Sequence, residues 1–187
     1  VNPSNPCGSV FSKSHMEEII ALAEKYEIPI VADEIYYGFS YDDEKPFYSF
    51  PHVNTTVPMI TLGAISKIYG VPGWRLGWII VYNRGGYFDD ILAKLKQISM
   101  IWLHPCSLIQ HALIKILKEV PQSYFDNSKA RLKEASEVAF NCLSGIRGIK
   151  PVKARGAMYM MVQLDHNEFE DIKDDVDFCK KLLNEQY

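Results

Sequence analysis

Residues 59–78 read MITLGAISKIYGVPGWRLGW, and this stretch decides the predicted fold around it. Its apolar beginning is typical of a buried strand, and Gly63 breaks the run shortly before Ser66 and Lys67. Arg75 follows in a turn rich in glycine. The stretch therefore predicts a lysine just after a buried strand and an arginine in the next turn.

The two basic side chains suit a cofactor that is held covalently and carries a phosphate. A lysine amine forms a Schiff base with an aldehyde, and the planar fork of an arginine binds a phosphate through two hydrogen bonds. For an isolated pair, however, a lysine with a buried stem and a surface arginine is the more common arrangement. Lys67 and Arg75 therefore need support from other parts of the chain.

That support begins with a second apolar run at residues 28–32, which Asp33 and Glu34 end abruptly. Continuous apolar runs are typical of parallel strands that are covered on both faces. A third run, at residues 78–81, follows the glycine-rich turn. The pattern predicts an α/β fold with a mostly parallel sheet, in which ligands bind outside the carboxyl ends of the strands. Asp33 and Lys67 would both lie at that edge.

The remaining pattern predicts helices and a change of architecture near residue 145. Ser12 or Ser14 is expected to cap a helix that ends near Tyr26, and apolar spacing predicts further helices at 88–101, 108–117 and 124–143. Two strands, at 149–152 and 157–162, and a helix at 174–185 are expected to follow. We therefore predict a large domain at residues 1–145 and a smaller, incomplete α+β domain at 146–187.

Composition narrows the class of protein. The chain has 187 residues, 48% of them apolar, and a net charge of −3 without a basic run, so no nucleic acid partner is expected. No apolar stretch is long enough to cross a membrane, and no leader is visible. The 4 cysteines and 5 histidines are dispersed, so no metal site and no disulfide framework is expected. We expect a cytoplasmic protein, with the mitochondrion as the alternative.

Several motifs together resemble those of the pyridoxal-phosphate-dependent aminotransferases related to aspartate aminotransferase. They are NPSNPCG at residues 2–8, DEIY at 33–36, SK at 66–67, PGWRLGW at 72–78 and RGAMYMMV at 155–162. The resemblance runs through the whole chain in order, and it is strongest to members that act on aromatic amino acids. It implies the fold of that family's large domain and part of its small domain, with pyridoxal 5'-phosphate as the cofactor. It also implies an amino acid, with tyrosine expected, and a 2-oxo acid such as 2-oxoglutarate as substrates.

The resemblance also assigns roles to individual residues. Lys67 would form the Schiff base and move the proton, which requires an amine that is neutral part of the time. Asp33 would pair with the pyridine nitrogen of the cofactor. Tyr36 and Asn5 would hydrogen-bond its phenolic oxygen and lower the basicity of the Schiff base.

The expected phosphate ligands are Arg75 and Ser66. Relatives often carry a serine three residues before the lysine, where this chain has Ala64, so Arg75 and backbone amides would carry more of the phosphate binding. The residues that bind the substrate carboxylate and stack on the ring have no counterpart in the chain. We therefore expect it to be part of a longer, homodimeric enzyme and to be inactive alone.

Three alternatives remain open. The same residues would serve a carbon–sulfur lyase or an alanine- or aspartate-type transaminase, because fold and cofactor do not fix the reaction. A catalytically silent fragment is the second alternative. The third is a nucleotide-binding protein, which would need the motif GxxxxGK followed by serine or threonine, and that motif is absent from the sequence.

Overall fold

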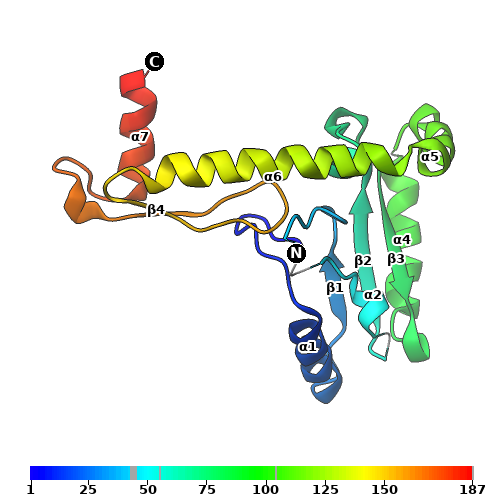
Figure 1. Ribbon diagram of the computed structural model, residues 1–187. Helices are drawn as coiled ribbons and strands as arrows, with labels where there is room; N and C mark the ends of the chain where they lie inside the picture. The colour runs from blue at the N-terminus through cyan, green and yellow to red at the C-terminus, as the bar shows by residue number, and fades with distance from the viewer. Residues whose placement is uncertain (43–45, 55, 104, 187) are drawn as a thin grey trace.

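Two of the predicted apolar runs form neighbouring parallel strands in the computed structural model, which describes residues 1–42, 46–54, 56–103 and 105–186 (Figure 1). They are β1 (Ile30–Asp33) and β2 (Met59–Ala64), and their register places Asp33 opposite Leu62. Because parallel strands end at the same edge of a sheet, the residues that follow β1 and β2 leave the sheet on one side.

The third strand differs from the prediction. β3 (Gly77–Tyr82) completes the order β1-β2-β3 but runs antiparallel to β2. The connection contains only the short helices α3 (Ile65–Ile68) and η1 (Pro72–Trp74), and it returns the chain along the same edge without a crossover helix. The three described strands of this sheet are therefore mixed in direction, while the α/β class of the fold is as predicted.

Helix α1 (Lys13–Lys25) packs against β1 and β2. Ser12 is its N-cap, and the Ser12 hydroxyl accepts a hydrogen bond from the backbone N–H of His15 at 3.2 Å. The apolar face of α1 joins a buried cluster with residues of β1, β2 and the connection between them: Met16, Ile20, Ala23, Ala32, Phe50, Val57 and Met59. This core fixes the position of the two parallel strands whose carboxyl ends carry the candidate site residues.

The predicted helices are present, with ends shifted by a few residues. The remaining elements, in chain order, are α2 (Phe50–Val53), η2 (Arg84–Gly86), α4 (Asp89–Ile101), α5 (Ser107–Glu119), α6 (Gln122–Ser144), β4 (Ile149–Pro151), β5 (Val162–Leu164), η3 (His166–Glu168) and α7 (Asp175–Gln186). In Figure 1, α6 extends as one long helix from beside α5 to the end of the molecule that carries β4 and α7. Each helix in the described residues is too short or too polar to span a bilayer.

Beyond α6 the chain forms a small antiparallel pair. β4 and β5 pair from Ile149 opposite Leu164 to Pro151 opposite Val162. The strand predicted at 157–162 is therefore wrong in position, because only its last residue belongs to β5. Ala157 has a φ of 56°, in the left-handed region that is incompatible with a strand.

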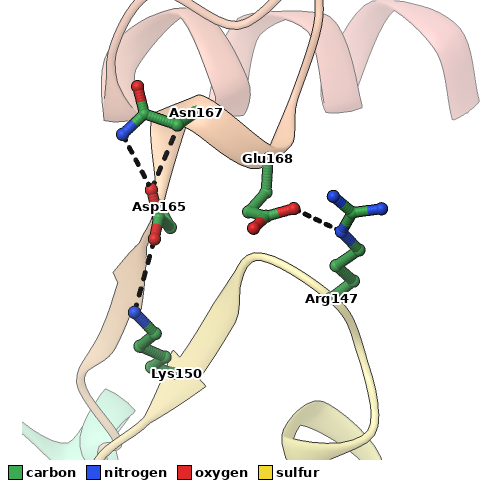
Figure 2. A network of polar contacts seen from close by, with 5 residues as sticks. All are labelled: Arg147, Lys150, Asp165, Asn167 and Glu168. Carbon is green, nitrogen blue, oxygen red and sulfur yellow. Dashed lines mark hydrogen bonds and ion pairs between the residues drawn. The ribbon is translucent and has the colours of Figure 1, made fainter.

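Polar contacts join the segment after β5 to β4 and to the loop that precedes β4 (Figure 2). Lys150 on β4 contacts Asp165 at 3.4 Å, and the Asp165 carboxylate also accepts hydrogen bonds from the backbone and side chain of Asn167, each at 3.3 Å. Arg147 forms an ion pair with Glu168. The hydrogen bond from Lys150, followed by that from the Asn167 backbone, lowers the pKa of Asp165. These pairs are exposed to solvent, so they orient the turn more than they stabilise the fold.

Residues 154–157 connect the C-terminal part of the chain to its beginning. The backbone N–H groups of Arg155 and Gly156 both donate to the carbonyl of Gly8, at 2.7 and 2.9 Å. On the other side, Ala157 N–H donates to the carbonyl of Phe39 at 2.8 Å, and Tyr41 N–H donates to the carbonyl of Arg155 at 3.0 Å. This segment therefore lies between two parts of the chain that are more than a hundred residues away in sequence.

Replacing Gly156 with alanine is expected to destabilise the fold. A Cβ atom at Gly156 would lie 2.6 Å from the carbonyl oxygen of Phe39 and 2.6 Å from a methyl group of Val10. Backbone would have to shift, at a cost of about 1 to 3 kcal/mol in the free energy of unfolding. Urea unfolding measures this, with Gly73→Ala as the control, because a Cβ there meets nothing within 4 Å. Equal midpoints for the two variants would contradict the close contact.

Candidate active site

Asp33 lies at the carboxyl end of β1, where the N-terminal turn of residues 2–8 meets the sheet. The backbone N–H of Asn2 donates to the Asp33 carbonyl at 3.0 Å, and the side chain of Asn2 accepts from Phe11 N–H at 3.0 Å. The Asp33 carboxylate accepts a hydrogen bond from the backbone N–H of Ile35 at 3.1 Å. Its half-buried carboxylate is therefore held in one orientation at the sheet edge.

Tyr36 follows Asp33 by three positions and is almost fully buried, with 2% of its surface exposed. The side chain of Asn5, from the N-terminal turn, forms a hydrogen bond with it, and Asp33 is close enough to act on it electrostatically. Its hydroxyl lies 2.6 Å from that of Tyr159. Burial, followed by the contact with Tyr159, raises the pKa of Tyr36, whereas the hydrogen bond with Asn5 opposes this. Tyr36 therefore remains a protonated phenol at neutral pH.

Lys67 reaches the same edge from the neighbouring strand. β2 leads directly into α3, where Ile65 is fully buried and Ser66 is 8% exposed, so the start of this helix is anchored in the core. The backbone N–H of Ile65 donates to the carbonyl of Leu76 at 3.2 Å. Lys67 itself is half-buried. Its backbone position is therefore fixed by the residues around it.

Arg75 lies in the turn between η1 and β3, and its side chain is exposed. Its backbone is left-handed, with φ of 50° and ψ of 40°, which is unfavourable for a residue other than glycine. The guanidinium donates a hydrogen bond to the carbonyl of Pro72 at 3.1 Å. The structure thus brings Asn5 and Asp33 to Tyr36, Asn5 through a hydrogen bond and Asp33 through its charge. Lys67 and Arg75 come from the helix after β2 and from the next turn.

Glu34, the second acid of the DEIY motif, has a structural role. Its buried carboxylate accepts hydrogen bonds from the Ser49 hydroxyl at 2.6 Å and from the Phe50 backbone N–H at 2.8 Å, at the beginning of α2. Burial raises the pKa of Glu34 despite these two bonds. The Glu34 carboxylate is thus hydrogen-bonded inside the core, whereas the Asp33 carboxylate is half-buried at the sheet edge.

Sequence reasoning did not identify Tyr159 as a site residue. The apolar run that contains it predicts a strand, whereas Tyr159 lies in an irregular segment before β5. Local periodicity could not reveal its place beside Tyr36, because the two residues are 123 positions apart. The only signal was its position within the RGAMYMMV motif.

Comparisons with known proteins agree with this geometry. The family model "Aminotransferase class I and II" matches residues 1–187. The chain is 41% identical to mouse tyrosine aminotransferase over 99% of the chain and 41% of the mouse protein. It is 33% identical to the cystine lyase CORI3 of Arabidopsis thaliana over the whole chain and 44% of that protein.

A solved structure supports the fold. The chain matches tyrosine aminotransferase from Leishmania infantum with a TM-score of 0.90 and 31% identity, over 97% of the chain and 44% of that protein. The chain therefore spans less than half the length of the relatives it matches. Because the family model covers all of its residues, the chain belongs to the class I and II aminotransferases, a family that depends on pyridoxal phosphate.

Proposed function

We propose that the whole protein transfers an amino group from an aromatic amino acid, with tyrosine as the expected donor, to a 2-oxo acid such as 2-oxoglutarate. The observation that carries this proposal is the shared sheet edge at which β1 and β2 end, with Asp33 as the last residue of β1 and Lys67 in the helix that follows β2. Similarity to tyrosine aminotransferases supports the aromatic substrate.

The donor set fits pyridoxal 5'-phosphate. That molecule carries a ring nitrogen, a phenolic oxygen, an aldehyde and a phosphate, and each needs a different partner. Asp33 offers an oriented carboxylate for the ring nitrogen. Tyr36 offers a buried phenol, with the amide of Asn5 beside it, for the phenolic oxygen. Lys67 offers a half-buried amine for the aldehyde. Arg75 supplies a charged fork for the phosphate.

When bound, the cofactor supplies an electron sink that stabilises negative charge at the α-carbon of the substrate. Lys67 would hold the cofactor through its aldehyde, and the Lys67 amine would be the group that takes the proton from the α-carbon of the substrate. Asp33 would keep a proton on the ring nitrogen. Tyr36 and Asn5 would donate hydrogen bonds to the phenolic oxygen.

The phosphate would be bound by Arg75 and Ser66 together with backbone amides. Ser66 is buried beside the anchored start of α3, which favours a fixed hydroxyl over a mobile one. Ala64 offers no hydroxyl at the position where relatives often have serine. Arg75 would then have to exchange its hydrogen bond with Pro72 for the phosphate, or share the guanidinium between the two.

Carbon–sulfur bond cleavage is the second candidate function, because a cystine lyase is 33% identical to the chain. Both reactions begin with removal of the same α-proton, and the proposed roles of Lys67 and Asp33 are the same in each. They differ in what leaves the substrate afterwards.

An assay of the whole protein with added cofactor separates the two reactions. With tyrosine and 2-oxoglutarate, glutamate and the 2-oxo acid of tyrosine should form, with kcat/KM at least about tenfold above that for release of pyruvate and ammonia from cystine. Alanine and aspartate serve as matched amino donors that lack an aromatic ring. Faster cleavage of cystine would favour the lyase, and faster transfer from alanine or aspartate would contradict the aromatic substrate.

We also propose that residues 1–187 alone bind the cofactor weakly and that the whole protein is a homodimer. Apolar side chains around the junction of α4 and α5 are unusually exposed, with Ile101 at 85%, Leu103 at 82% and Leu108 at 78%. Exposed apolar surface of this kind favours burial against further protein.

The proposed domain boundary near residue 145 is supported by the end of α6 at Ser144, after which β4, β5 and α7 follow at the far end of that helix (Figure 1). A reducing compartment such as the cytoplasm, or the mitochondrial matrix, is supported by the cysteines. All four are free, and all four are exposed to solvent.

A further inference from the structure

We propose that Tyr159 is a positioning residue, whose hydroxyl donates a hydrogen bond to Tyr36 and thereby directs the single phenolic proton of Tyr36 toward the cofactor. This inference rests on the proposed function, in which Tyr36 donates to the phenolic oxygen of pyridoxal phosphate. It adds to that site Tyr159, which follows α6 in the chain.

The two phenols form a close and specific pair. Their oxygens are 2.6 Å apart, and their rings are perpendicular, with centroids separated by 5.6 Å. Tyr36 is almost fully buried, so its hydroxyl has little access to water. A hydrogen bond in such surroundings is stronger than at the surface, and a lost partner is costly because water cannot replace it.

Counting protons determines the direction of the hydrogen bond when a ligand is present. A tyrosine hydroxyl donates one hydrogen bond and accepts up to two. Without a ligand, either phenol of the pair can be the donor. If the Tyr36 hydroxyl donates its hydrogen bond to Tyr159, it has no proton left to donate to the cofactor. When Tyr36 donates to the cofactor, Tyr159 and the amide of Asn5 must therefore be the donors to its two lone pairs.

The electrostatic surroundings keep the proton on Tyr36. Without a ligand they fit Tyr36 as the donor to Tyr159, so the proposed direction requires that cofactor binding reverses this hydrogen bond. The groups that act on Tyr36 are Tyr159, the carboxylate of Asp33 and the side chain of Asn5. Burial, followed by Tyr159 and then by Asp33, raises the pKa of Tyr36. The phenol therefore keeps its proton at neutral pH and can serve as a donor. A second phenol that donates to its oxygen polarises the O–H bond and strengthens that donation.

Tyr159 is placed by the backbone around residues 154–157. That segment is held between the carbonyls of Gly8 and Phe39, and Ala157 is fully buried there. The carbonyl of Tyr159 packs so closely on Gly8 that a Cβ atom at that glycine would lie 2.4 Å from it. The backbone that carries Tyr159 is thus held on one side by the N-terminal turn that supplies Asn5, and on the other side by Phe39.

Replacing Tyr159 with phenylalanine tests the inference, because the ring remains and only the hydroxyl is lost. In the whole protein, we expect the dissociation constant for pyridoxal phosphate to rise about 3- to 10-fold, as for the loss of one hydrogen bond. The pH midpoint of the bound cofactor's absorbance should move upward, in the same direction as in Tyr36→Phe but by less. In the double variant, Tyr159→Phe should add nothing to Tyr36→Phe.

Tyr41→Phe is the matched control. The Tyr41 hydroxyl donates to the carbonyl of Gly156 at 3.2 Å, so this variant removes a hydroxyl that binds the same segment and leaves the Tyr36–Tyr159 pair intact. Its midpoint and dissociation constant should match those of the unaltered protein. Equal shifts in the Tyr41 and Tyr159 variants would mean that Tyr159 acts only by holding the segment, and would overturn the proposal. No shift in Tyr159→Phe would also overturn it.

A measurement on the cofactor-free protein separates this inference from the proposed function. With the ring carbon that bears the hydroxyl labelled with ¹³C in every tyrosine, Tyr159→Phe should move the Tyr36 resonance, and Tyr41→Phe should not. If the resonance does not move, the hydroxyl pair is absent and the proposal fails, whatever the activity. If it moves but the protein binds no pyridoxal phosphate, the pair exists, and both the proposed function and the positioning role fail.

Discussion

Replacing Lys67 with alanine in the whole protein is expected to lower kcat/KM for amino transfer by at least about 10³-fold, the magnitude of losing a positioned proton carrier. The variant would also lose the amine that holds the cofactor aldehyde. Half-buried Lys67 lies in a helix that begins directly after β2, so no other residue can easily take its position. Steady-state kinetics with tyrosine and 2-oxoglutarate measures the effect.

Lys94→Ala is the matched control, because Lys94 lies exposed on α4. It should leave kcat/KM unchanged. Urea unfolding of both variants verifies that the Lys67 variant remains folded. A folded Lys67→Ala protein with kcat/KM within tenfold of the unaltered protein would show that another group moves the proton.

Asp33→Asn is expected to lower kcat about 10²- to 10³-fold, as for the removal of one preorganised electrostatic group. Asparagine has almost the same shape as aspartate, and its oxygen can still accept the hydrogen bond from Ile35 N–H. It has no negative charge, however, and so would not keep a proton on the ring nitrogen of the cofactor. Single-turnover kinetics, which separate chemistry from binding, should show the loss in the chemical step.

Glu34→Gln is the control for Asp33, because it makes the same chemical change one residue further along the chain. Glu34 accepts hydrogen bonds from Ser49 and Phe50, so this variant should change the unfolding midpoint and leave the chemical step within a few-fold. If Glu34→Gln slowed the chemical step as much as Asp33→Asn, the distinct roles assigned to the two acids would be wrong.

The elements that carry the site could be predicted from the sequence because they depend on local patterns. The apolar runs before Asp33 and Lys67 predicted β1 and β2, and the parallel pairing confirms that both strands end at one sheet edge. Asp33 is the last residue of β1, and Lys67 lies in the helix that follows β2. The family and its cofactor were also predicted, from motifs in register along the whole chain. The individual roles of Lys67, Asp33, Tyr36, Asn5, Ser66 and Arg75, and the domain boundary, stay predictions.

Features that depend on distant contacts could not be predicted. The antiparallel direction of β3 follows from the short helices α3 and η1, which an apolar run alone does not reveal. The strand expected at 157–162 fails because residues 154–157 bind Gly8 and Phe39. For the same reason Tyr159 was missed, since its partner Tyr36 lies 123 positions away.

The covalent role of Lys67 is the central claim, and one measurement tests it most directly. The whole protein, loaded with pyridoxal phosphate, is reduced with borohydride, digested and analysed by mass spectrometry. We expect the reduced cofactor on the peptide that contains Lys67, and its loss after addition of an amino acid substrate before reduction. Cofactor fixed to a different lysine, or to none in a protein that binds it, would contradict the claim.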